Sequence, residues 1–220
     1  VTLVVPHRDS FARMQVIRAC PSHASIRKHR ARTAWVSLEV MTRSPRIAPG
    51  RFKELGPVNW AITRVISKGA GVDDAHLFST LGRTGMLFSG WLYYSANLMP
   101  GGKLSRLDTE LSILRVAHLR ESEYEMDHHI RLGRRAGVTR ELLEQVKRGP
   151  SDPTWSDAHR AMLTAVDQLV QTKDLDDATW ATLAHHFSER QLVEFCLLIS
   201  QYDGLATTIG VLGIQRDSRT

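Results

Sequence analysis

Residues 123–137 read EYEMDHHIRLGRRAG, and the prediction of the fold starts from the pattern in this stretch. At about 100° per residue, Met126, Ile130 and Leu132 fall in one sector of a helix, whereas most of the charged side chains fall on the opposite side. Gly137 follows the last periodic residue, as glycine commonly does at a helix end. The stretch therefore predicts an amphipathic α-helix over residues 123–136.

The same helical period extends in both directions from this stretch. Ser188 and Gln191 have the spacing of a capping box. Thr139, and either Asp176 or Asp177, precede further periodic segments as candidate N-caps. No segment alternates with period two for long enough to indicate a sheet. We predict an all-α, single-domain helical bundle over residues 47–220, with helices near residues 57–69, 74–81, 84–98, 107–117, 123–136, 139–148, 155–171, 176–183 and 188–212.

Two of these helices carry specific packing predictions, and a third is identified by its spacing alone. Trp60, Ile62, Val65 and Ile66 follow Pro57 at helical spacing, which predicts a helix there. Residues 84–98 are apolar and aromatic, which predicts deep packing, in the core or at a subunit interface. Residues 192–212 are the most apolar stretch but contain polar and acidic side chains, so we interpret them as a buried core helix and not as a membrane span.

The positive charge of the chain is confined to its first segment. The whole sequence has a formal net charge of +6, but nine Lys and Arg residues face two acidic residues in 1–46, so the remainder is close to neutral. We predict that residues 1–46 are a disordered basic extension, or a translated leader with Met41 as the working start. A targeting peptide and an ordered arm on a neighbouring subunit remain open alternatives. A tail of this kind also leaves weak binding to nucleic acid as a hypothesis.

Glu125 and His129 interrupt the apolar sector of the 123–136 helix. They are four residues apart, so their side chains can meet on one face. Burial raises the pKa of a carboxyl and lowers that of an imidazole, and pairing opposes both shifts, so such a pair suits proton transfer near neutral pH. A purely structural polar pair is the alternative, and a metal site would need a third ligand that the sequence does not offer.

The remaining histidines and the cysteines are assigned no chemistry. His128 is expected on the solvated face, and one of the adjacent residues His185 and His186 is expected to face inward in a structural role. Cys20 and Cys196 form no C-x-x-C pair, which excludes a thioredoxin-like motif and indicates a reducing, cytoplasmic environment.

Five short segments within residues 50–217 resemble the carboxymuconolactone decarboxylase family of the alkylhydroperoxidase D-like superfamily. They are ELSILRVA at 110–117, EYEM at 123–126 with His129, ATW at 178–180, SERQLVE at 188–194 and QY at 201–202. The peroxidase branch has C-x-x-C where this chain has Ser122 and Glu125, and a thiol peroxidase cycle needs both thiols. The resemblance therefore points to the decarboxylase-like branch.

The resemblance implies a cofactor-free, metal-free carboxy-lyase that acts on a small carboxylated lactone or a related organic acid. It implies that His129 transfers the proton, that Glu125 orients His129 and tunes its pKa, and that Glu110 acts as an outer or relay acid. Arg115, Tyr124 and Ser122 are the expected substrate-binding residues, with Arg115 as a candidate carboxylate anchor.

The resemblance also implies a homo-oligomer, either a trimer or a hexamer. No membrane partner is expected, and the aromatic 84–98 helix is a candidate interface. A non-catalytic helical oligomer or binding protein of the same fold is the alternative function, and it predicts that replacing His129 changes stability without affecting any turnover.

Overall fold

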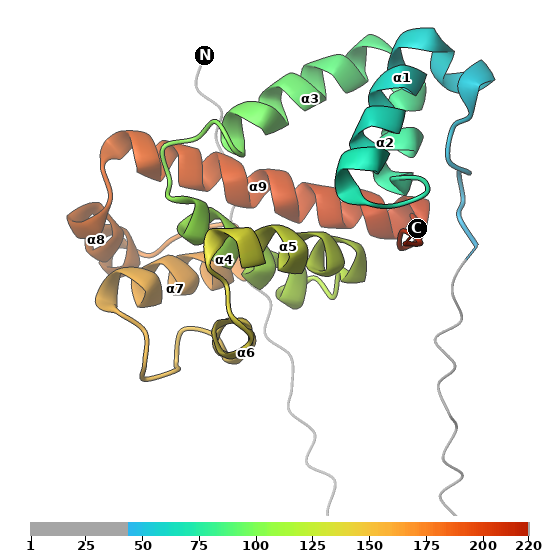
Figure 1. Cartoon of the computed structure of the whole chain (residues 1–220). Coiled ribbons are helices and arrows are strands. Elements are labelled where there is room, and N and C mark those ends of the chain that lie inside the picture. The colour runs from blue at the N-terminus through green and yellow to red at the C-terminus, as the bar shows by residue number, and fades with distance from the viewer. Residues whose placement is uncertain (1–43, 220) are drawn as a thin grey trace, which may run out of the picture. The chain divides into compact units, whose positions relative to one another are not determined.

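The computed structural model describes residues 44–219, so most of the predicted basic extension lies outside the described residues. The described residues belong to the unit of residues 41–220. Within them the chain forms nine α-helices and one 3-10 turn without a β-strand, and this confirms the all-α prediction (Figure 1). The elements are α1 (Phe52–Ala70), α2 (His76–Leu81), η1 (Gly82–Thr84), α3 (Met86–Leu98), α4 (Arg106–Leu119), α5 (Glu123–Ala136), α6 (Arg140–Arg148), α7 (Asp157–Thr172), α8 (Asp177–His186) and α9 (Glu189–Leu212).

Side-chain caps set several of the helix boundaries. The Ser188 hydroxyl accepts a hydrogen bond from the Gln191 backbone N–H, and the Gln191 side chain accepts one from the Ser188 N–H. The Thr139 and Asp176 side chains cap α6 and α8 by accepting from the backbone N–H of Leu142 and Thr179, without a reciprocal bond. These contacts satisfy backbone donors that have no partner inside the helix, and they confirm the predicted caps.

Helix α4 lies at the centre of the larger hydrophobic core. Residues 109–117 of α4 are all buried, and Ile113, Leu114 and Val116 are fully enclosed. The helix contacts α5, α6, α7 and α9, so polar side chains on it are held among apolar neighbours. Glu110 lies on this helix and is fully buried, so its carboxylate is held inside the core.

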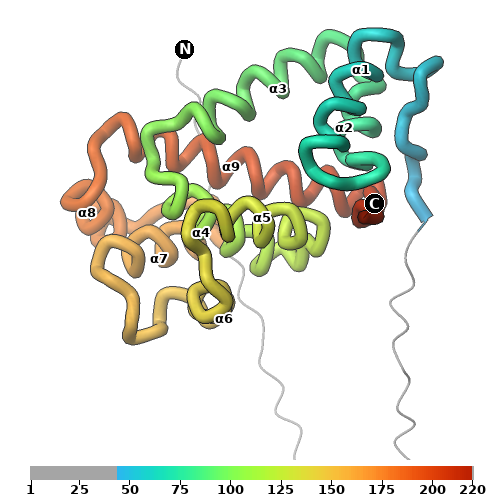
Figure 2. The backbone as a smooth tube through the Cα atoms, in the orientation of Figure 1, coloured from blue at the N-terminus to red at the C-terminus, as the bar shows by residue number. Residues whose placement is uncertain are grey.

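Helix α9 contacts α3, α4, α7 and α8, and Figure 2 shows its course. By length and apolar composition alone, α9 could cross a membrane. The core helices of soluble proteins can have the same length and composition. Leu192, Phe195 and Leu198 face the core, where α9 contacts α4 and α7, but Val193 and Leu197 are exposed. The prediction of a buried core helix therefore holds for one face only.

Helix α1 is present where the spacing after Pro57 predicts it, but its buried side is mostly polar. Its buried face contains Asn59, Thr63 and Ser67, whereas Trp60 and Val65 are exposed. The polar side chains face inward because they satisfy backbone groups of the segment that follows α1. The Asn59 amide donates to the Gly82 carbonyl at 2.9 Å, and the Ser67 hydroxyl accepts from the Ala75 N–H at 2.9 Å.

Residues 84–98 are predicted to be deeply packed, and within a single copy of the chain this prediction is wrong. In α3 only Phe88 and Leu98 are buried. Met86, Leu87 and Tyr93 are 85%, 70% and 76% exposed, because α3 spans from η1 to α9 and contacts those elements along one side. The alternative role for this helix, an interface, stays a prediction.

Candidate functional site

A cavity of about 240 Å³ lies where α2 and α3 meet α5 and α9. Most of its wall is apolar, with contributions from Leu77, Phe78, Trp91, Leu92, Met99 and Leu205. The polar side chains of the wall come mainly from α5, and they are Ser95, Tyr124, Glu125, His128, His129 and Tyr202. A concave apolar site with a few converging polar groups is typical of small-molecule binding.

His129 is held by a buried carboxylate of the neighbouring helix. The Nδ1 of His129 on α5 lies 2.8 Å from Oε2 of Glu110 on α4, and both side chains are buried. Arg106, one turn before Glu110, donates to Oε1 of Glu110 at 2.7 Å. Because Nδ1 is engaged by Glu110, Nε2 is the ring nitrogen left to exchange a proton with a molecule in the cavity.

Glu125 occupies the position predicted for it but does not pair with His129. Glu125 is 2% exposed, and neither carboxylate oxygen has a hydrogen bond of good geometry to a described residue. The nearby Ser122 hydroxyl favours the ionised form of Glu125, but the effect of burial is larger. Burial raises the pKa of Glu125 from 4.5 to about 7. The expected role of Glu125 in orienting His129 is therefore wrong, because Glu110 has that role. Glu125 is instead a carboxyl group whose burial favours its protonated form.

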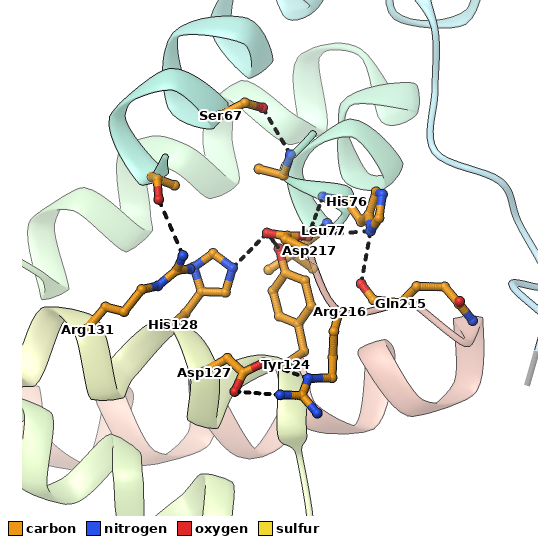
Figure 3. Close-up of polar contacts among 12 residues, drawn as sticks. Ser67, His76, Leu77, Tyr124, Asp127, His128, Arg131, Gln215, Arg216 and Asp217 are labelled. Atoms are coloured by element: carbon orange, nitrogen blue, oxygen red, sulfur yellow. Dashed lines mark hydrogen bonds and ion pairs between the residues drawn. The ribbon is translucent and has the colours of Figure 1, made fainter. Parts of the chain in front are cut away.

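A second histidine of the cavity wall is paired with a carboxylate from the segment after α9 (Figure 3). Nε2 of His128 lies 2.8 Å from Oδ2 of Asp217, and the Tyr124 hydroxyl donates to the same oxygen at 3.1 Å. The other oxygen of Asp217 accepts from the backbone N–H of His76 at 3.0 Å. Asp217 therefore links α2 to α5 beside the cavity, and the prediction that His128 is a solvated surface residue is wrong.

Contacts of both its ring and its hydroxyl fix the position of Tyr124. It stacks on His128 with ring centroids 4.7 Å apart, and its hydroxyl accepts from the Leu77 N–H at 3.3 Å (Figure 3). Burial, followed by the charge of Asp217, raises the pKa of Tyr124 well above its usual value. Tyr124 lines the cavity as a neutral phenol, in agreement with its predicted place in the site.

Arg115 does not reach the cavity, which corrects its assignment as a carboxylate anchor. Its guanidinium forms a two-bond ion pair with Asp167 on α7, at 2.6 and 2.8 Å, and also donates to the carbonyls of Val146 and Lys147. These contacts use the guanidinium to tie α4 to α6 and α7. Arg115 is thus a buried structural residue.

The other predicted residues lie away from the cavity. Ser122 is the N-cap residue of α5 and lines a separate surface depression between α4 and α5. Cys196 on α9 is partly buried, and burial raises the pKa of its thiol. His185 and His186 are both exposed, so the prediction that one faces inward is wrong. Across residues 44–219, no three His, Cys, Asp or Glu side chains are grouped as metal ligands.

Replacing Asp217 by asparagine should lower the free energy of unfolding by about 2 kcal/mol, because a buried carboxylate loses hydrogen bonds that involve a charged group. The His128 imidazole and the Tyr124 hydroxyl would then face an amide that offers a weaker acceptor. Urea unfolding measures the change, with Asp157→Asn, an exposed acid in the first turn of α7, as the matched control. Equal stabilities of the two variants would contradict the assigned role of Asp217.

Comparison with known proteins gives a family match and several structural neighbours. Residues 87–168, which include Glu110, Glu125 and His129, match the model of the carboxymuconolactone decarboxylase family. No curated protein matches the sequence. Three solved structures share the fold at sequence identities below 20%, which supports the fold alone.

The first neighbour is an uncharacterized peroxidase-related protein from Silicibacter sp. TM1040, with TM-score 0.67 and 13% identity over 80% of this chain and 94% of the other. The second is described as an alkylhydroperoxidase AhpD core, an uncharacterized peroxidase-related protein from Ralstonia eutropha JMP134, with TM-score 0.64 and 18% identity over 77% and 92%. The third is the debrominase Bmp8 in its apo form, with TM-score 0.61 and 18% identity over 78% and 92%.

Proposed function

Because the chain belongs to the carboxymuconolactone decarboxylase superfamily, we propose that it is an acid–base enzyme that decarboxylates a small unsaturated lactone or a related organic acid. The observation that carries the proposal is that two buried ionisable side chains, His129 and Glu125, lie at the same apolar cavity. His129 is fixed by Glu110 at 2.8 Å, and Glu125 is buried beside the same cavity with its pKa raised to about 7. Groups that titrate near neutral pH are the ones that exchange protons efficiently there.

The proposed reaction is balanced without a cofactor. The bond between the ring carbon and the substrate carboxylate breaks, and carbon dioxide leaves without its bonding electron pair. That pair moves through the ring double bond to the lactone carbonyl, so negative charge develops on the carbonyl oxygen. One proton then adds to the carbon next to the carbonyl, and the solvent replaces it on the enzyme.

Each buried group has a distinct role in this scheme. Glu125, in its protonated form, delivers the proton to the carbon. His129, as an imidazolium stabilised by the Glu110 carboxylate, donates from Nε2 to the oxygen on which charge develops. Arg106 holds the second oxygen of Glu110 and thereby keeps this carboxylate oriented.

Thiol peroxidase chemistry is not proposed, although two structural neighbours carry peroxidase-related names. The positions of the two motif cysteines are occupied by Ser122 and Glu125. Cys196 is the only cysteine among the described residues, and it does not line the cavity. A peroxide-reducing cycle requires a thiolate that attacks and a second thiol that resolves the product.

Ultraviolet-monitored turnover of a panel of unsaturated lactones tests the proposed function. Each compound carries a carboxyl group on the saturated ring carbon, and the panel varies the second substituent on that carbon, with 4-carboxymuconolactone as one member. Turnover of at least one member would support a carboxy-lyase. No turnover of any member would contradict the proposal and favour a non-catalytic helical oligomer of the same fold.

We further propose that the protein is a homo-oligomer, either a trimer or a hexamer. The supporting observation is the amount of apolar side chain exposed on α1, α3 and α9, because large exposed apolar patches commonly mark interfaces. The exposed residues on these helices include Val58, Val65, Met86, Leu87, Val193 and Leu197.

Light scattering after size-exclusion chromatography should give a mass of three or six chains. Leu87→Glu should lower that mass, because it places a charge in the apolar face of α3. Ala181→Glu on the exposed side of α8 serves as the control and should leave the mass unchanged. A parent protein that elutes as a monomer would contradict the proposal.

A further inference from the structure

The size of the cavity matches a single ring. Its volume is about 240 Å³, and an apolar cavity of about 150 Å³ holds one benzene molecule. Trp91, Phe78 and Leu92 present flat or branched apolar surface to the interior. A five- or six-membered ring with short substituents therefore fits, and its apolar substituents would contact these side chains.

The charges beside the cavity leave room for one anion. His128 is paired with Asp217, whereas Glu110 accepts from both His129 and Arg106, and both carboxylates are almost completely buried. If both imidazoles are protonated, three positive charges face two carboxylates, so one positive charge is unmatched. Among the described residues that line the cavity there is neither lysine nor arginine. A ligand with one carboxylate would restore neutrality, whereas a second carboxylate would meet no unmatched positive charge.

The cavity nevertheless offers unused hydrogen-bonding groups. Both carboxyl oxygens of Glu125 and the Ser95 hydroxyl are buried without a hydrogen-bond partner among the described residues. Ser95 lies on α3 and Glu125 on α5, and both line the cavity. A protonated Glu125 and the Ser95 hydroxyl are two donors, which is enough for one carboxylate or carbonyl group of a ligand. A second carboxylate would lie against apolar side chains, where an unpaired charge is strongly disfavoured.

We infer that the cavity selects a single-ring compound that bears one carboxylate and otherwise apolar substituents, and that it discriminates against dicarboxylates. The inference rests on the proposed function for which bond of the substrate breaks. The preference for one carboxylate over two follows from the residues that line the cavity. It makes 4-carboxymuconolactone, which carries two carboxylates, a poor substrate of this chain. The preferred lactone would carry an aliphatic group where 4-carboxymuconolactone has its carboxymethyl arm.

A binding experiment tests the selectivity independently of catalysis. Titration calorimetry at pH 7 compares 2-furoate with 2,5-furandicarboxylate, which share one ring and differ in a single carboxylate. We expect 2-furoate to bind at least tenfold more tightly to the parent protein. Equal affinities, tighter binding of the dicarboxylate, or binding of neither compound would overturn the inference.

A charge added to the cavity wall should reverse the preference. Leu92→Lys places an ammonium group in the wall, and we expect it to improve binding of 2,5-furandicarboxylate at least tenfold relative to 2-furoate. Tyr93→Lys is the matched control, because Tyr93 is the next residue of α3 but is exposed and does not line the cavity. The same change in both variants would show a general charge effect and overturn the inference.

Turnover separates this inference from the proposed function. The substrate pair is 4-carboxymuconolactone and the lactone whose carboxymethyl arm is replaced by an isobutyl group of the same shape. Faster turnover of the isobutyl compound, by at least tenfold in kcat/KM, supports both the function and the selectivity. Faster turnover of 4-carboxymuconolactone would support the function and overturn the selectivity. Binding selectivity without turnover of either lactone would support the selectivity and contradict the function.

Discussion

Replacing His129 by asparagine should lower kcat by about 10²- to 10³-fold on a lactone that the parent protein decarboxylates, which is the range for loss of one positioned donor to a developing oxyanion. His129 is the cavity residue whose Nδ1 is held by Glu110, and the neutral asparagine amide cannot supply the charged N–H that stabilises the lactone oxygen. Steady-state kinetics measures the effect, and circular dichroism checks that the variant is folded.

The control for this prediction is a histidine outside the cavity. His186→Asn changes an exposed residue at the C-terminal end of α8 and should leave kcat within about twofold of the parent value. If His129→Asn keeps the parent kcat while its stability falls, His129 is a structural residue and its assigned role in stabilising charge on the lactone oxygen is wrong.

Glu125→Gln should make the protein more stable at alkaline pH, although the variant should lose turnover. Burial raises the pKa of Glu125 from 4.5 to about 7, so the folded protein holds a proton that the unfolded chain releases at lower pH. Below pH 4.5 both states are protonated, and ionisation of Glu125 costs no stability. Between pH 4.5 and 7 the stability of the parent falls, and above pH 7 the full cost is about 3 kcal/mol at most. Glutamine removes this cost because it does not ionise.

Urea unfolding at pH 5 and at pH 8.5 measures this difference. The two proteins should have similar free energies of unfolding at pH 5, and Glu125→Gln should exceed the parent by about 2 to 3 kcal/mol at pH 8.5. Glu144→Gln, which changes an exposed acid of α6 paired with Lys147, should change stability by less than about 1 kcal/mol at either pH. A constant difference between Glu125→Gln and the parent across this pH range would show that Glu125 is ionised in the folded protein.

Local patterns in the sequence were sufficient to predict the helices and part of the site. The bounds of α5 follow from its apolar sector and from Gly137, and the capping box at Ser188 follows from residues three apart. The placement of Glu125 and His129 on the buried side of α5 also follows from periodicity. Each of these features depends on residues within one helix, where the backbone geometry is known in advance.

Contacts between distant segments could not be predicted in this way. Glu110 bonds His129 across 19 residues, and periodicity within α5 instead favoured its neighbour in the helix, Glu125. Asp217 follows the last helix in a segment without a periodic pattern, so nothing indicated that it would bond His128. The resemblance to the family did include Glu110, but it did not specify which atom of the site Glu110 contacts.

The packing of α1 and α3 also depended on tertiary contacts. Asn59 and Ser67 are buried because they satisfy backbone groups of residues 75–85, and a helical wheel does not contain those groups. The apolar side chains of α3 remain exposed because too few elements of the same chain cover them. A hydrophobic pattern predicts that a face will be covered, but it does not specify whether the same chain or another copy covers it.

The most direct test of the proposed acid–base site is the release of carbon dioxide from the isobutyl-substituted lactone acid, measured for the parent protein, His129→Asn and Glu125→Gln. We predict rapid release by the parent and a loss of at least 100-fold in kcat for each folded variant, an effect of the size expected for positioned proton-transfer groups. Equal release by all three proteins would contradict the central claim that Glu125 supplies the proton and His129 stabilises the developing charge in this cavity.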